Sequence, residues 1–176
     1  GLADAGLEVY KPSGTYFVSA NGPFGYLGVS VLSGEAIPAG TTTLDIAVER
    51  GTLVSGTVTD AVTGAALQGI RVTLYAEFGP GEWLPWTSTT TGGGAYSLVV
   101  SSGSYRVGFS NPNGRYIGEY HQNALTVDAA QTLVTVNGVD QPNIDAQLSL
   151  GSILSGTVTA ASGGAPVDGA CVSVRT

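Results

Sequence analysis

The segment Gly51-Thr-Leu-Val-Ser-Gly-Thr-Val-Thr59 recurs about 100 residues later as Gly151-Ser-Ile-Leu-Ser-Gly-Thr-Val-Thr159. The alignment extends without a gap over 51–76 and 151–176, where 11 of 26 residue pairs are identical. A repeat at a fixed period marks a chain that is built from copies of one structural unit. Because valine and threonine dominate between the glycines, the repeated unit is expected to consist of short β-strands separated by turns.

A second match runs through the other half of the repeat. The stretch 13–18 (Ser-Gly-Thr-Tyr-Phe-Val) resembles 102–107 (Ser-Gly-Ser-Tyr-Arg-Val), and 44–49 resembles 144–149. One residue separates each of the stretches 44–49 and 144–149 from the recurring glycine, which is Gly51 in the first copy and Gly151 in the second. The repeated unit is therefore about 100 residues long, which is a common size for a single domain.

These matches divide the chain into three parts. Residues 51–150 are expected to form one complete module. Residues 1–50 correspond to the C-terminal part of a preceding module, and 151–176 to the N-terminal strands of the next.

The complete module reads as an all-β unit. Ile70, Val72 and Leu74 alternate with Arg71 and other more polar residues, and this period of two is typical of a half-buried strand. About eight such strands are expected, enough for an immunoglobulin-like Greek-key β-sandwich. The expected strands are 52–59, 69–76, 83–91, 95–100, 104–110, 116–121, 132–136 and 144–148.

The charge of the chain excludes several classes of partner. Six Lys and Arg residues stand against thirteen Asp and Glu residues, for a net charge of −7. Nucleic-acid binding needs a basic face to meet phosphates, and the sequence has no basic cluster. The same deficit argues against an anionic membrane surface, and no apolar stretch approaches the roughly 20 residues that span a bilayer.

Composition favours a secreted or cell-surface protein. The chain is rich in Gly, Thr and Ser, has one lysine, Lys11, and contains no methionine. An exported protein whose signal was removed, or a piece cut from a longer chain, would lack an initiator methionine. Cys171 is the single cysteine, so neither a disulfide framework within the chain nor a multi-thiolate metal site is expected.

The junction between repeats predicts a stiff connection. One expected strand ends near Leu150 and the next begins near Ile153, which leaves too few residues for a flexible linker. Successive modules should therefore stack at restricted angles as a semi-rigid rod. A rod of this kind spaces or bears load and has no chemistry of its own.

Six segments of the complete module form a recognisable pattern, at 55–60, 63–69, 72–74, 87–91, 94–97 and 102–107. In order and spacing these segments resemble the carboxypeptidase regulatory-like domains, which share a transthyretin-like sandwich with the Cna B-type repeats of bacterial surface adhesins. The resemblance implies a bacterial exported protein in which such modules act as stalks, spacers or adhesive scaffolds. Cna B-type modules often carry a lysine isopeptide crosslink, but 51–150 contains no lysine.

No catalytic or metal-binding constellation stands out. The single histidine, His121, has no nucleophile motif that would complete a hydrolase triad. The acidic residues are scattered singly, without the pairing that glycoside hydrolysis requires. Asp60, Asp140 and Asp145 fall in or near turns but form no calcium loop, so solvated turn aspartates are the preferred interpretation. The sequence predicts a protein that is not an enzyme and that has no cofactor and no metal.

Two tryptophans are the candidate ligand-binding residues. Trp83 and Trp86 flank Leu84-Pro85, and flat aromatic faces suit sugar rings. Strand alternation places the two tryptophans on opposite faces, so at least one is expected in the core. A carbohydrate-binding module that contacts a surface glycan is the alternative to the structural function. Cys171, if exposed, is a candidate for an intermolecular disulfide.

The two partial modules are complementary in the strands they supply. Open strand edges invite pairing, so one hypothesis is a head-to-tail filament in which the end of one chain completes the start of the next. The other interpretation is a stretch of a longer repeat protein. The expected partners are accordingly other copies of the chain or adjacent modules of one long chain.

Overall fold

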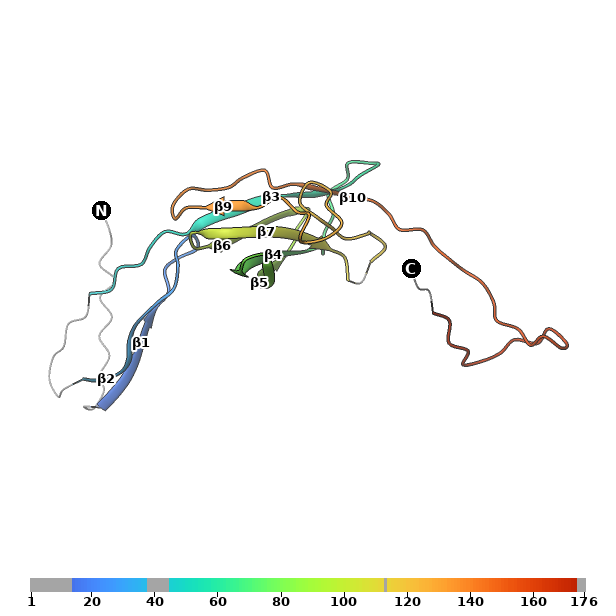
Figure 1. Ribbon diagram of the computed structural model, residues 1–176, viewed down its shortest axis with the longest axis horizontal. Coiled ribbons are helices and arrows are strands. Elements are labelled where there is room, and N and C mark those ends of the chain that lie inside the picture. Colours follow the sequence, from blue (N-terminus) through green and yellow to red (C-terminus); the bar gives the residue numbers. More distant parts are fainter. Residues whose placement is uncertain (1–13, 38–44, 113, 174–176) are drawn as a thin grey trace.

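The computed structural model describes residues 14–37, 45–112 and 114–173 (Figure 1). Lys11 and the start of the 44–49 match lie outside these residues. The described residues form ten strands and no helix long and apolar enough to cross a membrane. The strands are β1 (Gly14–Ala20), β2 (Val29–Ile37), β3 (Thr52–Asp60), β4 (Arg71–Gly79), β5 (Glu82–Thr90), β6 (Ala95–Val100), β7 (Gly103–Ser110), β8 (Glu119–Tyr120), β9 (Leu133–Thr135) and β10 (Ala146–Leu148).

Strands β3–β10 form a β-sandwich. One sheet has the order β10-β3-β6, in which β10 runs parallel to β3 and β6 runs antiparallel to it. The other sheet has the order β5-β4-β7-β8, with β9 beside β8 on the same edge of β7. The all-β prediction is confirmed, and each of the eight strands expected in 51–150 overlaps an observed strand.

The core lies between the two sheets and follows the predicted alternation. Val72 and Leu74 of β4 are fully buried, whereas Arg71 between Ile70 and Val72 is exposed. Across the core, the rings of Tyr96 and Phe109 meet edge to face with centroids 6.0 Å apart. The remaining core residues come from both sheets and their turns: Val54, Val58, Leu67, Leu98, Val100, Tyr105, Val107, Leu133, Ile144, Ala146 and Leu148.

An antiparallel hairpin, β1–β2, precedes the sandwich. In the connection between its two strands, Tyr26 forms a backbone bridge with Arg50, and the same bridge recurs between Tyr116 and Leu150. Each bridge has two flanking hydrogen bonds, so the repeat in sequence is matched by a repeat in backbone pairing. These bonds run from Leu27 N–H to Glu49 O (2.8 Å) and Gly51 N–H to Gly25 O (2.8 Å), and from Ile117 N–H to Ser149 O (2.9 Å) and Gly151 N–H to Arg115 O (2.7 Å).

The turn after β3 also recurs after the second copy of the motif. Gly64 and Gly164 adopt φ values of 70° and 66°, a left-handed conformation that glycine adopts without strain. The bridge from Thr59 to Ala66 has its counterpart in the bridge from Thr159 to Pro166. The same local sequence therefore builds the same turn, whether or not a sandwich surrounds it.

Residues 152–158, the counterparts of 52–58 in β3, do not form a strand. No strand pairs with them in the part of the chain that the structure describes. In Figure 1 the chain after β10 runs away from the sandwich, while the β1–β2 hairpin lies at the opposite end.

Candidate functional site

The turn after β3 is held by the carboxylate of Asp60. Its Oδ1 accepts hydrogen bonds from the Val62 N–H (2.9 Å), the Thr63 N–H (2.7 Å) and the Thr63 hydroxyl (2.9 Å). Its Oδ2 accepts one from the Tyr116 hydroxyl (2.9 Å). The Thr63 backbone bond, followed by the Tyr116 bond, lowers the pKa of Asp60 to about 2. The prediction of a solvated turn aspartate is wrong here, because Asp60 is only 6% exposed and ties the turn to Tyr116.

A second carboxylate fastens β10 to β3. Asp145 Oδ1 accepts from both the Thr57 N–H (2.7 Å) and the Thr57 hydroxyl (2.9 Å). Beside it, a Cβ added at Gly56 would lie 2.2 Å from the Ile144 carbonyl oxygen. The segment before β10 therefore passes so close to β3 that only glycine fits at position 56.

A third group of polar side chains joins the N-terminal part to the sandwich. Arg50 contacts the carboxylate of Asp140 at 2.6 Å, and Asp140 Oδ1 also accepts from the Leu53 N–H (3.1 Å). The Arg50 guanidinium, followed by the Leu53 bond, lowers the pKa of Asp140. Asn137 donates to the Glu49 carboxylate at 2.9 Å. The residues on both sides of Gly51 are thus fixed by hydrogen bonds to the 137–140 loop.

Asp60, Asp140 and Asp145 therefore hold separate parts of the backbone. Among the residues described, no group of three or more His, Cys, Asp and Glu side chains is placed to hold a metal ion.

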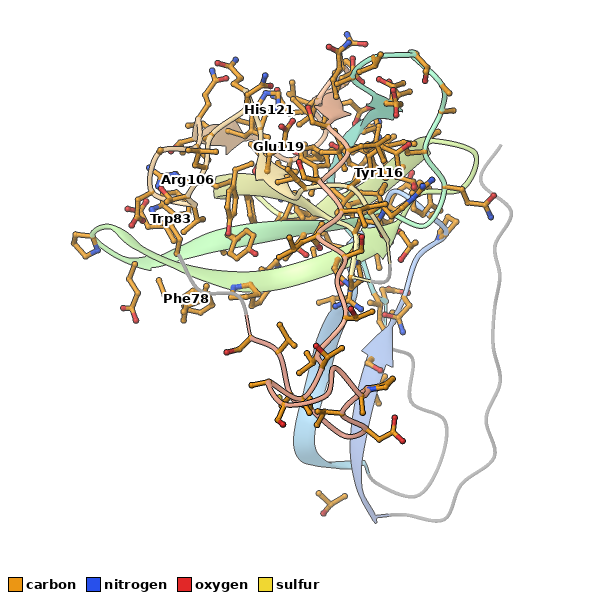
Figure 2. The ribbon with its side chains drawn as sticks, turned by 90° about the vertical axis from the view of Figure 1, so that its right-hand side faces the viewer. Phe78, Trp83, Arg106, Tyr116, Glu119 and His121 are labelled. Atoms are coloured by element: carbon orange, nitrogen blue, oxygen red, sulfur yellow. The ribbon has the colours of Figure 1, made fainter. Side chains whose placement is uncertain are left out.

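Trp83 lies on the outer face of the five-stranded sheet under a charged side chain. The guanidinium carbon of Arg106 sits 4.1 Å from the Trp83 ring centroid, a cation–π geometry. Arg106 also donates to the Val127 carbonyl (2.7 Å) and lies 3.8 Å from the Asp128 carboxylate. Figure 2 shows Trp83 and Arg106 side by side near the end of the β4–β5 hairpin. One face of the Trp83 ring is therefore already covered within the chain.

Trp86 is on the other face and is open to solvent. It is 57% exposed, its ring centroid is 6.0 Å from that of Phe78, and Phe78 is 58% exposed. Leu84 on the same hairpin is 43% exposed. The expectation that one tryptophan is in the core is wrong, because both lie on β5, an edge strand of its sheet, and Trp86 stands at a register shift in the β4–β5 pairing. We call Phe78, Leu84 and Trp86 the hairpin patch.

A shallow groove of about 210 Å³ lies on the outer face between β4 and β8. Tyr75 and Tyr120 line it with ring centroids 5.7 Å apart, and Glu119 lies at its end. Burial raises the pKa of Tyr75, and burial also raises the pKa of Glu119. The groove is open and small.

His121 is in the turn after β8. Its Nδ1 is buried and has no hydrogen-bond partner among the described residues. Burial lowers the pKa of its ring, because a buried site disfavours the charged form. Figure 2 shows His121 away from Phe78, the labelled member of the hairpin patch.

Cys171 is exposed, on the extended C-terminal segment. Its counterpart in the complete module, Arg71, is also exposed.

No protein-family model matches the chain, and no curated protein matches its sequence. The resemblance to the carboxypeptidase regulatory-like and Cna B-type domains therefore stays a prediction.

Sequence reasoning missed two features of these sites. The contact between Arg106 and Trp83 joins strands that are not neighbours in sequence, and no local pattern signals it. The role of Gly56 had a signal, because the Ser-Gly-Thr-Val-Thr motif keeps its glycine in both copies. A glycine inside a strand often marks a close approach of another backbone segment.

Proposed function

We propose that the chain is a non-catalytic structural repeat of an extracellular or cell-surface fibre or stalk. In this proposal its modules are immunoglobulin-like, transthyretin-like Greek-key sandwiches, divided as 1–50, 51–150 and 151–176. The observation that carries the proposal is the recurrent pairing at the module junction, where Tyr26 bridges Arg50 and Tyr116 bridges Leu150. The chain passes from one unit to the next inside a hydrogen-bonded pair, without a free linker.

We attribute the stiffness of the junction to its backbone hydrogen bonds rather than to the ion pair between Arg50 and Asp140. Arg50 and Asp140 side chains are 46% and 39% exposed. An ion pair this open to water contributes about 0–1 kcal/mol. The backbone bonds on either side of Gly51 and the closure by the 137–140 loop restrict the chain more than this ion pair does. Such a junction transmits orientation from one module to the next, which is what a stalk requires.

The same proposal covers location and partners. A chain with a net charge of −7, rich in threonine and glycine, suits an extracellular repeat that meets other copies of itself or adjacent modules. Its acidic surface does not favour nucleic acid. It requires no cofactor.

Small-angle X-ray scattering tests the stiff junction. Four residues, Gly-Ser-Gly-Ser, are inserted between Arg50 and Gly51, and the control carries the same insertion at the β4–β5 turn after Pro80. We expect the junction insertion alone to give the scattering profile of two units on a flexible tether. Identical profiles for the wild type and the junction insertion would show that the junction was already flexible.

The hairpin patch favours a second candidate, a carbohydrate-binding module. Two aromatic rings, Phe78 and Trp86, are more than half exposed and adjacent, and such faces stack on sugar rings. Glycan-array binding that is lost on Trp86→Ala would support it. Phe24→Ala is the matched control, because Phe24 is a 74% exposed aromatic residue outside the patch. An array without binding by the wild type would remove this candidate.

A further inference from the structure

Residues 151–173 carry core side chains without a core around them. Leu154 is 80% exposed, whereas its counterpart Val54 is fully buried. Val158 is 44% exposed and its counterpart Val58 is fully buried. The segment thus has the inward-facing residues of β3, but the described residues supply no sheet to cover them.

The complete module shows which strand should lie beside this segment. In it, 58–60 of β3 pair in parallel with 146–148 of β10. The counterparts of these two segments are 158–160 and 46–48. Neither is in a strand, and neither pairs with the other in the part of the chain that is described. They lie toward opposite ends of the molecule in Figure 1, so within one copy neither segment is placed to pair with the other.

The polar contact that fixes the register is also present in both copies of the repeat. Thr57 donates twice to Asp145 in the complete module. The counterparts are Thr157 and Asp45, and both are exposed. Ile46 and Val48, the counterparts of inward-facing β10 residues, are half-buried.

Gly156 gives an independent argument. A Cβ added to Gly56 would strike a backbone carbonyl at 2.2 Å, whereas a Cβ added to Gly156 would meet nothing within 4 Å of the described atoms. The backbone of Gly156 is also not left-handed. Nothing around Gly156 among the described residues therefore requires glycine at this position. The approach of a second backbone segment, as at Gly56, would require it.

We propose that residues 152–160 of one copy add in parallel to residues 45–49 of a second copy, with Thr157 donating to Asp45 and Gly156 facing the incoming backbone. This inference rests on the proposed structural function and specifies its partner, a second copy of the chain. Strand addition of this kind uses backbone hydrogen bonds for affinity and side-chain pockets for register. Because different surfaces of the two copies meet, each added chain leaves one free donor and one free acceptor, and repetition of the contact extends a filament.

One feature of the complete module is absent from this joint. Ala160 stands in place of Asp60, so the second copy's Tyr26 cannot repeat the hydrogen bond between Tyr116 and Asp60. The register therefore rests on Thr157, Asp45 and Gly156.

Two variants separate the two sides of the joint. Gly156→Val blocks the donor segment and leaves Asp45 intact, while Asp45→Lys replaces the acceptor carboxylate and leaves Gly156 intact. Both positions are exposed or open in the single chain, so neither change is expected to affect its fold. Ser155→Val is the matched control, because it adds the same side chain one residue away, on the opposite face of the strand.

Sedimentation velocity of the full 176-residue chain over a concentration series is the measurement. We expect the wild type and Ser155→Val to form a ladder of oligomers. Asp45→Lys alone should weaken association about tenfold to a hundredfold, as for a lost charge-assisted hydrogen bond. Gly156→Val alone should weaken it at least as much, because its side chain would meet the incoming backbone. Both variants should therefore stay monomeric at concentrations where the wild type assembles. Their equimolar mixture should form one dimer and no larger species, because it contains one intact donor and one intact acceptor.

Two results would overturn the inference. A wild type that stays monomeric would show that the segments do not recognise each other. A Gly156→Val chain that assembles like the wild type would place the contact elsewhere. In either case the stalk proposal stands or falls separately on the scattering test of the Arg50–Gly51 junction.

Discussion

Substitution of Gly56 by alanine should strongly destabilise the sandwich, while the same change at Gly156 should not. Inside an ordinary strand, alanine is more stable than glycine by about 0.5–1 kcal/mol because glycine loses more backbone freedom. At Gly56 this gain is reversed by contact, since the new Cβ would lie 2.2 Å from the Ile144 carbonyl oxygen and 2.6 Å from its carbonyl carbon. Both atoms are backbone and cannot rotate away.

The size of the effect follows from what must move. To reach an ordinary contact, the segment before β10 must shift by more than 1 Å, roughly the gap between 2.2 Å and the 3.4 Å at which contacts become ordinary. That shift breaks the hydrogen bonds from Thr57 to Asp145 and loosens Ile144 in the core. Overpacking costs about 1–3 kcal/mol, and with the lost hydrogen bonds we expect about 3 kcal/mol. For a module of this size that corresponds to a fall in Tm of about 12 °C or more.

Urea unfolding followed by tryptophan fluorescence measures both variants, because Trp83 and Trp86 lie on the module that unfolds. It should be run at low concentration, where any association is negligible. Gly156→Ala should change the free energy of unfolding by less than about 0.5 kcal/mol, as for an open surface site. Equal effects at the two positions, or a Gly56→Ala cost below about 1 kcal/mol, would refute the close approach of the two segments.

Three further predictions test other parts of the structure. Asp60→Asn should remove a pH dependence of the stability. Because the pKa of Asp60 is lowered to about 2, its contribution to the free energy of unfolding is present above its unfolded pKa of 3.8 and is lost as the pH falls toward 2. The Tm of the variant should therefore change less than that of the wild type in an acid titration over this range. Leu74→Ala should cost about 2–5 kcal/mol in urea unfolding because Leu74 is fully buried between the sheets. Cys171 should react with a thiol reagent in the native protein as fast as in urea, because it is exposed; protection in the native protein would contradict this.

The strand pattern was predictable because it is local. One buried face is predicted by the spacing of Ile70, Val72 and Leu74 alone, and all three are buried in the structure. A period of two needs no knowledge of which strand lies opposite. The same holds for the turn at Gly64, whose sequence recurs at Gly164 with the same bridge.

The sites were harder to predict because they depend on how the strands are placed relative to one another. Alternation assigns Trp83 and Trp86 to opposite faces, but it does not reveal that both lie on an edge strand or that the β4–β5 register shifts at Trp86. Trp86 is therefore exposed on what should be a core face. Asp60 likewise looked like a surface turn residue, and its hydrogen bond to Tyr116 spans 56 positions of sequence.

The repeat also indicates which parts of a strand-complemented module would be weak. The complete module fastens β3 in two places, through Asp145 on Thr57 and through Asp60 on Tyr116. The second copy of the motif keeps the first fastening residue, Thr157, but has Ala160 in place of Asp60. In a joint built from 152–160 and a second copy's 45–49, Thr157 would thus set the register. The joint would lack the counterpart of the hydrogen bond between Asp60 and Tyr116. Such a joint should come apart before the complete module unfolds, so heating a filament should give separate chains with intact sandwiches first and unfolded chains only at higher temperature.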